Sequence, residues 1–353
     1  MADRIPFVVI GENVHATRIV KRDGRHVGGG DGSEHVVFVD AKGQDRIMPM
    51  AGPVRAGSDF EKGNVKHVRN ALLLGLGGDH VLPADLTGDV DDELAQIGRD
   101  YLIAVAVRQQ SNGAHYIDLN VDELDGDPAI QKAAIEWAVT LLEPELDIPL
   151  ALDSSSAAVL AAGLRISNKP NGPLLINSAS AERLDTLDIA AETVSPVVLS
   201  AAGVGTLPSD AAGRIGNSQD IVSAALERGI PLSNIHVDPL VIPVAVDSNA
   251  GTAYLDAVRA VRSEYGPEIR ITGGLSNISF GLPNRRLLNE AFVAIAVDAG
   301  VDSGIINPNG LNVEKALATD RGSDAFKSAA DVLNGVDQFA MEYLTAFRSG
   351  KLS

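Results

Sequence analysis

Eight short apolar segments, each ending in a polar residue or glycine, recur along this chain and are separated by segments long enough to form helices. This alternation predicts strands that are each followed by a helix. Eight such units over about 300 residues favour a closed parallel (β/α)8 TIM barrel over an open, doubly wound sheet. The absence of a G-x-G-x-x-G turn after any strand points the same way. The expected strands are Phe7–Gly11, Tyr116–Asn120, Pro149–Asp153, Leu174–Asn177, Val197–Ser200, Ile235–Asp238, Ile269–Asn277 and Ser303–Asn307.

One interval, residues 15–91, breaks this rhythm within what we expect to be a single barrel domain spanning residues 1–353. It is rich in glycine and charge, and HVVFVDAKGQDRIMPMAGPV inside it alternates like a β-hairpin with its turn at Lys42–Gln44. We therefore expect an insertion on the first βα loop, on the catalytic face of the barrel. It would be a lid or a partner contact, or else a surface hairpin without a function. At the other end of the chain, Ala325–Arg348 is expected to form one long helix.

Charge and composition exclude several classes of protein. The 353 residues include 29 Lys and Arg and 47 Asp and Glu, a net charge of −18, and such a surface repels nucleic acid and anionic membranes. There is no cysteine, which excludes disulfides, zinc–thiolate sites and protein-ligated iron–sulfur clusters. No apolar run approaches the roughly 18 residues of a membrane span, and the run near the amino terminus is too short for a signal peptide. We expect a cytoplasmic protein that binds neither nucleic acid nor membrane.

Polar residues end seven of the eight expected strands. In a βα barrel the active site lies at the carboxyl ends of the strands, so these residues are the informative ones. A single Asp or Asn there is more often a helix cap or a turn residue, and Asp153, which three serines follow, is the strongest case for that reading. Helix capping alone explains less well why polar residues end seven of the eight expected strands. The residues are Glu12, Asn13, Asp118, Asn120, Asp153, Asn177, Asp238, Asn277 and Asn307.

This set has acceptors and donors but little nucleophilicity. The chain shows no H-E-x-x-H helix and no Ser–His–Asp arrangement, and His236 has no second histidine at ligand spacing, so we expect His236 to be a core residue. Carboxylates can accept two charge-assisted hydrogen bonds from an aminopyrimidine edge, and carboxamides can satisfy a carbonyl and ring nitrogens. A pterin fits that description. A phosphate site at Gly273–Gly274 ranks second, because no basic residue follows until Arg285.

Six motifs resemble the pterin-binding methyltransferases, in which methyltetrahydrofolate exchanges its N5 methyl group with the cobalt of a corrinoid protein. They are IGENV (10–14), GAHYIDLNV (113–121), PLALDSS (149–155), INSAS (176–180), HVDPLVIPV (236–244) and GLSNISFGLPNR (274–285). The resemblance covers the first strand and about residues 95–320 in the same order. The insertion has no counterpart in the compact members of the family.

The resemblance implies roles for individual residues. The pterin ring would be held by Asp153, Asn177 and Asp238, with Asp118, Asn120 and Glu12 in the same pocket and Arg285 near the folate tail or the corrinoid. Asn277 would hydrogen-bond N5. Methyl transfer from a tertiary amine is slow unless the departing nitrogen gains a proton, so a hydrogen bond that strengthens as N5 is protonated would speed the reaction.

The same resemblance sets the expected substrates and partners. Methyltetrahydrofolate or tetrahydrofolate is the substrate, cobalamin arrives on a corrinoid partner protein, the chain forms a homodimer, and no metal is bound to the chain itself. Dihydropteroate synthase is an alternative, although its usual Asn-x-Thr-Pro-Asp-Ser-Phe loop is replaced here by GENVHAT and its terminal Arg-x-His element is missing. A non-catalytic folate-binding or corrinoid-docking protein is the other alternative.

Overall fold

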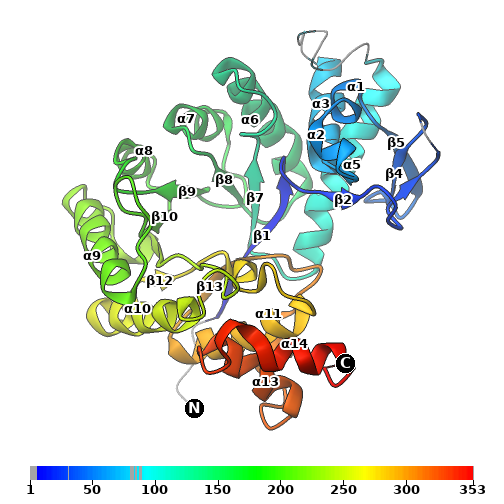
Figure 1. Ribbon diagram of the computed structural model, residues 1–353. Coiled ribbons are helices and arrows are strands. Elements are labelled where there is room, and N and C mark those ends of the chain that lie inside the picture. Colours follow the sequence, from blue (N-terminus) through cyan, green and yellow to red (C-terminus); the bar gives the residue numbers. More distant parts are fainter. Residues whose placement is uncertain (1–5, 31, 80–82, 84–85, 87–89, 353) are drawn as a thin grey trace. The chain divides into compact units, whose positions relative to one another are not determined.

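The main sheet of the protein has eight strands that alternate with helices along the chain (Figure 1). The computed structural model describes residues 6–30, 32–79, 83, 86 and 90–352. In order across the sheet, the strands are β12 (Arg270–Ile271), β11 (Ile235–Asp238), β10 (Val197–Ser200), β9 (Leu175–Ala179), β8 (Leu150–Asp153), β7 (Tyr116–Asn120), β1 (Val8–His15) and β13 (Ser303–Ile306). A parallel bridge joins Gly274, after β12, to Ile305 in β13. The predicted (β/α)8 barrel is confirmed.

The chain divides into two compact units. We name Gly11–Leu174 the N-unit, and Met1–Ile10 together with Leu175–Ser353 the C-unit. Helices α1 (Gly52–Arg55), α2 (Ser58–Glu61), α3 (His67–Asp79), α5 (Asp92–Ser111), α6 (Pro128–Leu142) and α7 (Ala157–Ile166) belong to the N-unit. Helices α8 (Asp185–Thr193), α9 (Ala211–Glu227), α10 (Ala250–Tyr265), α11 (Arg285–Ala299), α12 (Val313–Leu317), α13 (Asp324–Leu333) and α14 (Met341–Arg348) belong to the C-unit. Every helix among the described residues is too short or too polar to cross a bilayer.

The hairpin predicted inside the insertion is confirmed. Strands β4 (His35–Val39) and β5 (Asp45–Pro49) pair antiparallel, and β3 (Val27–Gly28) pairs with β4 on its other side. Asp40 forms the turn, since its Oδ1 accepts the backbone N–H groups of Lys42 and Gln44, each at 2.9 Å. A second short ribbon joins β2 (Val20–Lys21) to β6 (Asn64–Val65).

Helix α3 makes the end of the insertion part of the N-unit core. Its leucines Leu72 and Leu73 are fully buried at 0% exposure. Where α3 meets α5, a Cβ atom on Gly98 would lie 2.6 Å from the backbone nitrogen of Gly75, so glycine is required for this close approach. The insertion is therefore more than a hairpin on the surface, although part of it, residues 80–82, 84–85 and 87–89, lies outside the described residues.

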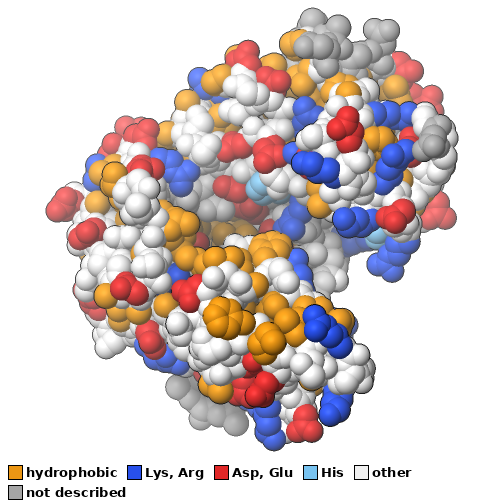
Figure 2. Space-filling view, viewed as in Figure 1, with side chains coloured by type: hydrophobic (Ala, Val, Ile, Leu, Met, Phe, Trp, Pro, Cys, Tyr) orange, Lys and Arg blue, Asp and Glu red, His pale blue; other side chains and the backbone are white. Residues whose placement is uncertain are grey.

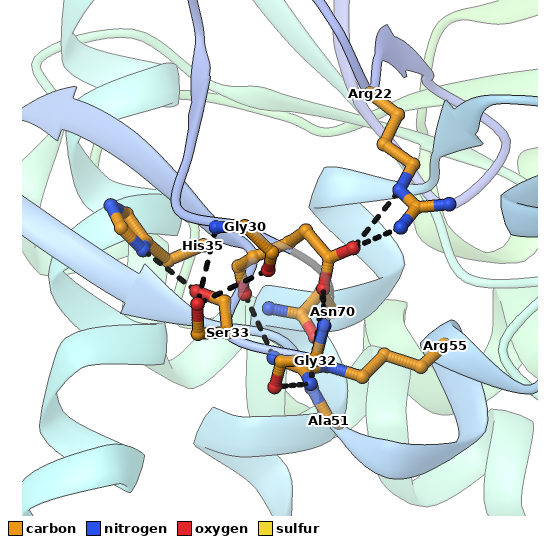
Figure 3. A network of polar contacts seen from close by, with 9 residues as sticks. Arg22, Gly30, Gly32, Ser33, His35, Ala51, Arg55 and Asn70 are labelled. Carbon is orange, nitrogen blue, oxygen red and sulfur yellow. Dashed lines mark hydrogen bonds and ion pairs between the residues drawn. The ribbon is translucent and has the colours of Figure 1, made fainter.

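Arg22, Gly32 and Arg55, which Figure 3 labels, surround the buried Glu34 in the interior of the insertion. Its carboxylate accepts hydrogen bonds from Arg22 Nε at 3.0 Å and from the backbone of Gly32 at 3.1 Å, and Arg55 donates to its carbonyl oxygen at 3.0 Å. Hydrogen bonds from backbone N–H groups, together with Arg22, lower the pKa of Glu34. Asn70 on α3 donates to the Pro49 carbonyl at 2.9 Å, which ties the hairpin to this helix.

Two sequence predictions in the C-unit are wrong. The seventh strand stops at Ile271, and Asn277 lies instead in a 3₁₀ helix, η3 (Leu275–Ser279), after two consecutive glycines. The expected single helix Ala325–Arg348 is split into α13 and α14 by a second 3₁₀ turn, η4 (Gln338–Ala340). Phe339 has a φ angle of +58° there, which is incompatible with a continuous right-handed helix. Separately, His236 is a core residue as predicted: it is 5% exposed and contacts Ser303 Oγ at 3.3 Å.

Candidate active site

The predicted site residues fall into both units, and each group is described by itself. In the N-unit, β7 and β8 are in parallel register with Asn120 opposite Asp153. Asn120 Nδ2 donates to Asp153 Oδ2 at 3.0 Å, while Asn120 Oδ1 accepts the backbone N–H of Asp122 at 3.0 Å. Because a backbone N–H can only donate, the carboxamide orientation is fixed. Asp118, on the same strand, is 2% exposed.

Asp122 is a site residue that sequence reasoning missed. Its two carboxylate oxygens accept hydrogen bonds from Ser154 Oγ at 2.6 Å and from the backbone and hydroxyl of Ser155, both at 2.8 Å. Asp122 thereby holds the loop that follows Asp153. The N-cap residue of α7 is Ser156, so Asp153 does not cap that helix. Helix capping, the alternative role for which Asp153 was the strongest case, is therefore wrong for this residue.

Glu12 is engaged by a neighbouring cation. Arg18 Nη2 lies 2.7 Å from Glu12 Oε1, and Arg18 Nε donates to the Glu12 carbonyl at 2.9 Å. The segment is also anchored to α5, since buried Gln109 accepts the backbone N–H of Asn13 at 2.9 Å. Glu12 therefore serves at least to fix the chain at the carboxyl end of β1.

His15, which sequence reasoning did not single out, lies beside Asp153. Its Nε2 is 3.5 Å from Asp153 Oδ2, and the two side chains are 23% and 25% exposed. The backbone N–H of Thr17 donates to His15 Nδ1 at 3.2 Å, so Nδ1 is unprotonated and the neutral ring carries its proton on Nε2, facing Asp153. The contact is long for a hydrogen bond, as is common in sites without substrate.

In the C-unit, Asp238 ends β11 and is half-buried. Its Oδ1 accepts the backbone N–H of Leu240 at 2.8 Å. Burial raises the pKa of Asp238 to about 6, and the Leu240 hydrogen bond and the Arg214 charge oppose that rise. A Cβ atom on Gly273 would come within 3.2 Å of both Asp238 Oδ1 and the Tyr254 hydroxyl, which shows how closely the backbone after β12 approaches the carboxylate.

Asn277 is exposed on η3, and the turn around it is braced. Its backbone N–H donates to Gly274 O at 2.9 Å, and a Cβ atom on Gly274 would lie 2.7 Å from its Nδ2. Arg285 donates from Nε to Ser279 Oγ at 3.0 Å and from Nη2 to Ser276 O at 2.8 Å. Arg285 thus supports the turn that presents Asn277.

Asn177 is half-buried on β9, where it pairs with Val198 of β10. The register between the two strands shifts directly after this pair, and such an irregularity redirects side chains at a strand end. In the C-unit the structure therefore places Asp238 at the end of β11, Asn177 within β9, which continues past its predicted end to Ala179, and Asn277 in η3, after β12.

Each group, taken by itself, contains hydrogen-bond acceptors and carboxamides of the kind that a polar heterocycle needs. In the part of the chain that the structure describes, no three His, Asp or Glu side chains come together as metal ligands would. Each carboxylate is fixed by protein donors through one oxygen, Oδ2 in Asp153 and Oδ1 in Asp238. Such fixed acceptors suit the N–H groups of an aminopyrimidine ring.

Comparison with known proteins matches residues 87–307 to the family described as pterin binding enzyme. The chain is 29% identical over 253 residues to methylcorrinoid:tetrahydrofolate methyltransferase of Eubacterium limosum, covering 70% of this chain and 87% of that protein. It is 32% identical over 231 residues to methionine synthase of Mycobacterium tuberculosis, covering 60% of this chain but 19% of that protein. Among solved structures, a dihydropteroate synthetase matches 71% of this chain and 89% of its own, with 18% identity and a TM-score of 0.49.

Proposed function

Because the chain belongs to the pterin binding enzyme family, we propose that it transfers the N5 methyl group between methyltetrahydrofolate and the cobalt of a corrinoid carried by a partner protein. The relative from Eubacterium limosum, which is named for this type of transfer, supports the proposal. The structural observation that carries it is the fixed orientation of Asp153 and Asp238. Among the described residues, the second oxygen of each carboxylate has no hydrogen-bond partner and can accept pterin N–H groups.

Asn277 is the proposed catalytic residue. Arg285 braces the turn that carries Asn277, so the backbone at Asn277 needs little reorganisation during the reaction. A carboxamide is not a strong acid, and Asn277 would act by hydrogen bonding to N5 as that nitrogen gains its proton and the methyl group leaves. The corrinoid supplies the chemistry at cobalt. Asn177, Asp118 and Asn120 complete the proposed set of pterin-binding residues.

The insertion is proposed to meet the corrinoid protein. Residues 15–69 contain ten Lys and Arg and seven Asp and Glu, whereas the whole chain has 29 and 47. Figure 2 shows Lys and Arg side chains gathered on this part of the N-unit. A cavity of about 700 Å³ there is lined by Lys21, Arg22 and Lys62, together with Asp23 and Glu34. Lys66 Nζ contacts Glu123, in the loop after β7, at 2.6 Å, which attaches the insertion at the site end of that strand.

A methyl-transfer assay tests the function. The purified protein, mixed with methyltetrahydrofolate and Co(I) cobalamin, should consume Co(I), as followed by its absorbance. Asp153→Ala and Asp238→Ala should each lower folate affinity by about 10- to 100-fold, because each leaves pterin N–H groups unpaired. Binding that both variants leave intact would contradict the assigned pocket, and dihydropteroate formation without loss of Co(I) would replace the proposed reaction. The expected homodimer stays a prediction.

A further inference from the structure

Arg214, on the first turn of α9, is a buried cation that the proposed reaction does not use. Its side chain is 0% exposed. Within the described residues its Nε and Nη2 atoms have no hydrogen-bond partner. Burying a guanidinium with unpaired N–H groups costs free energy. The contacts that Arg214 does make should therefore explain why it is buried.

Among the described residues, the side-chain hydrogen bonds of Arg214 all go to the turn that follows Asp238. Nη1 donates to the carbonyl oxygen of Pro239 at 2.8 Å and also to that of Leu240. Leu240 has a φ angle of +69°, a left-handed conformation that a leucine rarely adopts. This same residue donates its backbone N–H to Asp238 Oδ1. The guanidinium therefore holds a strained turn whose purpose is to orient the carboxylate.

Arg214 also supplies charge. It acts electrostatically on Asp238, and its other charged or titratable neighbours are Asp247, Tyr254 and Asp210. Tyr254 comes from α10 and donates its hydroxyl to Thr272 O at 2.9 Å. His236, two residues before Asp238, is buried, and burial lowers its pKa to about 3, so it stays neutral. Arg214 is thus the cation that counteracts the burial of Asp238.

We propose that Arg214 is a positioning residue of the pterin site: it fixes the turn after β11 and places a positive charge behind the half-buried Asp238 carboxylate, which favours the ionised form that accepts pterin N–H groups. The part that concerns the pterin rests on the proposed function. The part that concerns the ionisation of Asp238 does not, and it can be measured on the protein without ligand.

The first experiment is a carbon-13 NMR titration of the aspartate carboxyl groups, with Asp238 assigned by Asp238→Asn. Arg214→Met should raise the titration midpoint of Asp238 by about one pH unit or more, and Arg214→Lys should leave it within roughly half a unit. Arg214→Gln, which keeps an amide donor for the turn, serves as a second neutral variant if the methionine variant does not fold. Arg228→Met, at the carboxyl end of the same helix, is the matched control and should leave the midpoint unchanged.

The proposal is overturned if the neutral variant leaves the midpoint at the wild-type value, or if lysine shifts it as far as methionine does. Calorimetry with tetrahydrofolate then tests the binding role at about pH 6.5 and 8.5. The neutral variants should lose about threefold more affinity, or more, at the lower pH, where a larger fraction of Asp238 gains a proton. An equal loss at both pH values would mean a structural role only. Failure of the wild type to bind tetrahydrofolate would contradict the proposed function and leave the titration result standing.

Discussion

Asp153 and Asp238 are the same residue type at the same position, the last residue of a barrel strand, yet the protein holds them in different ways. Asp153 is 25% exposed, the Asn120 carboxamide donates a hydrogen bond to it, and His15 Nε2 lies 3.5 Å from the same oxygen. Asp238 is held by a backbone N–H in a strained turn, with a buried guanidinium behind it. The comparison shows that strand position supplies the acceptor, while the surroundings decide how its charge is maintained.

The largest effect is expected on the rate of methyl transfer when Asn277 is replaced. This substitution tests whether Asp153 and Asp238 are sufficient for folate binding without Asn277. Asn277→Ala should slow the methyl-transfer step by roughly 100-fold, the scale of losing one preorganised hydrogen bond. Folate affinity should change far less, because Asp153 and Asp238 remain. Single-turnover kinetics with Co(I) cobalamin measures the rate and the affinity separately. Equal losses in both would make Asn277 a third binding residue.

The pH dependence of folate affinity distinguishes the two carboxylates directly. Asp238 has a pKa of about 6 without ligand, and hydrogen bonding to pterin N–H groups favours its ionised form. Affinity should therefore fall by up to about tenfold per pH unit as the pH drops below 6. Asp238→Asn should flatten this dependence, and Asp153→Asn should retain it. Calorimetric titrations of both variants across that pH range measure this dependence. If Asp153→Asn lost the pH dependence of folate affinity and Asp238→Asn kept it, the titrating carboxylate would be Asp153 instead.

A smaller effect is expected at His15, which acts on one carboxylate only. His15→Ala should weaken folate binding by about three- to tenfold, the scale of one neutral hydrogen bond, and His15→Gln should recover part of it. The dependence of affinity on pH that Asp238 produces should be unchanged. His115, which is exposed at the amino end of β7, provides the matched control as His115→Ala. An effect of that control as large as that of His15→Ala would remove His15 from the site.

The smallest effect on folate is expected from the insertion. Lys21→Ser combined with Lys62→Ser should leave folate affinity unchanged but slow methyl transfer with the corrinoid protein a few-fold, with a weaker dependence on salt, because surface charges act mainly on association. Lys132→Ser, at an exposed position on α6, is the control. A double variant with the wild-type rate and salt dependence would exclude this surface as the partner contact. Deleting the whole insertion is not a usable test, because α3 belongs to the core.

The sequence predicts the eight strands because each is a short apolar run between polar ends. It also predicts that Asn120 and Asp153 lie at the carboxyl ends of two consecutive strands, and the structure adds the hydrogen bond between them. It fails at Asn277, where two glycines replace a strand with a 3₁₀ turn, and at the broken carboxy-terminal helix. Arg214 could not be found in this way, because an arginine in a helix usually lies in solvent and its burial depends on tertiary packing. His15 lies in the segment GENVHAT (11–17), but its contact with Asp153 depends on loop geometry, which the sequence does not show.

The burial of Asp238 also affects the conformational stability of the protein. Its pKa of about 6 in the folded chain lies above the ordinary value of 3.8, so folding favours the protonated form. The stability that this form contributes is present in acid and is lost as the pH rises through 6, a difference of about 3 kcal/mol. At neutral pH the ionised Asp238 carboxylate therefore contributes about that much less to folding stability than the protonated form does in acid. If folate binds at Asp238 as proposed, binding would offset this loss, and the free energy of unfolding would rise with folate concentration most clearly above pH 6.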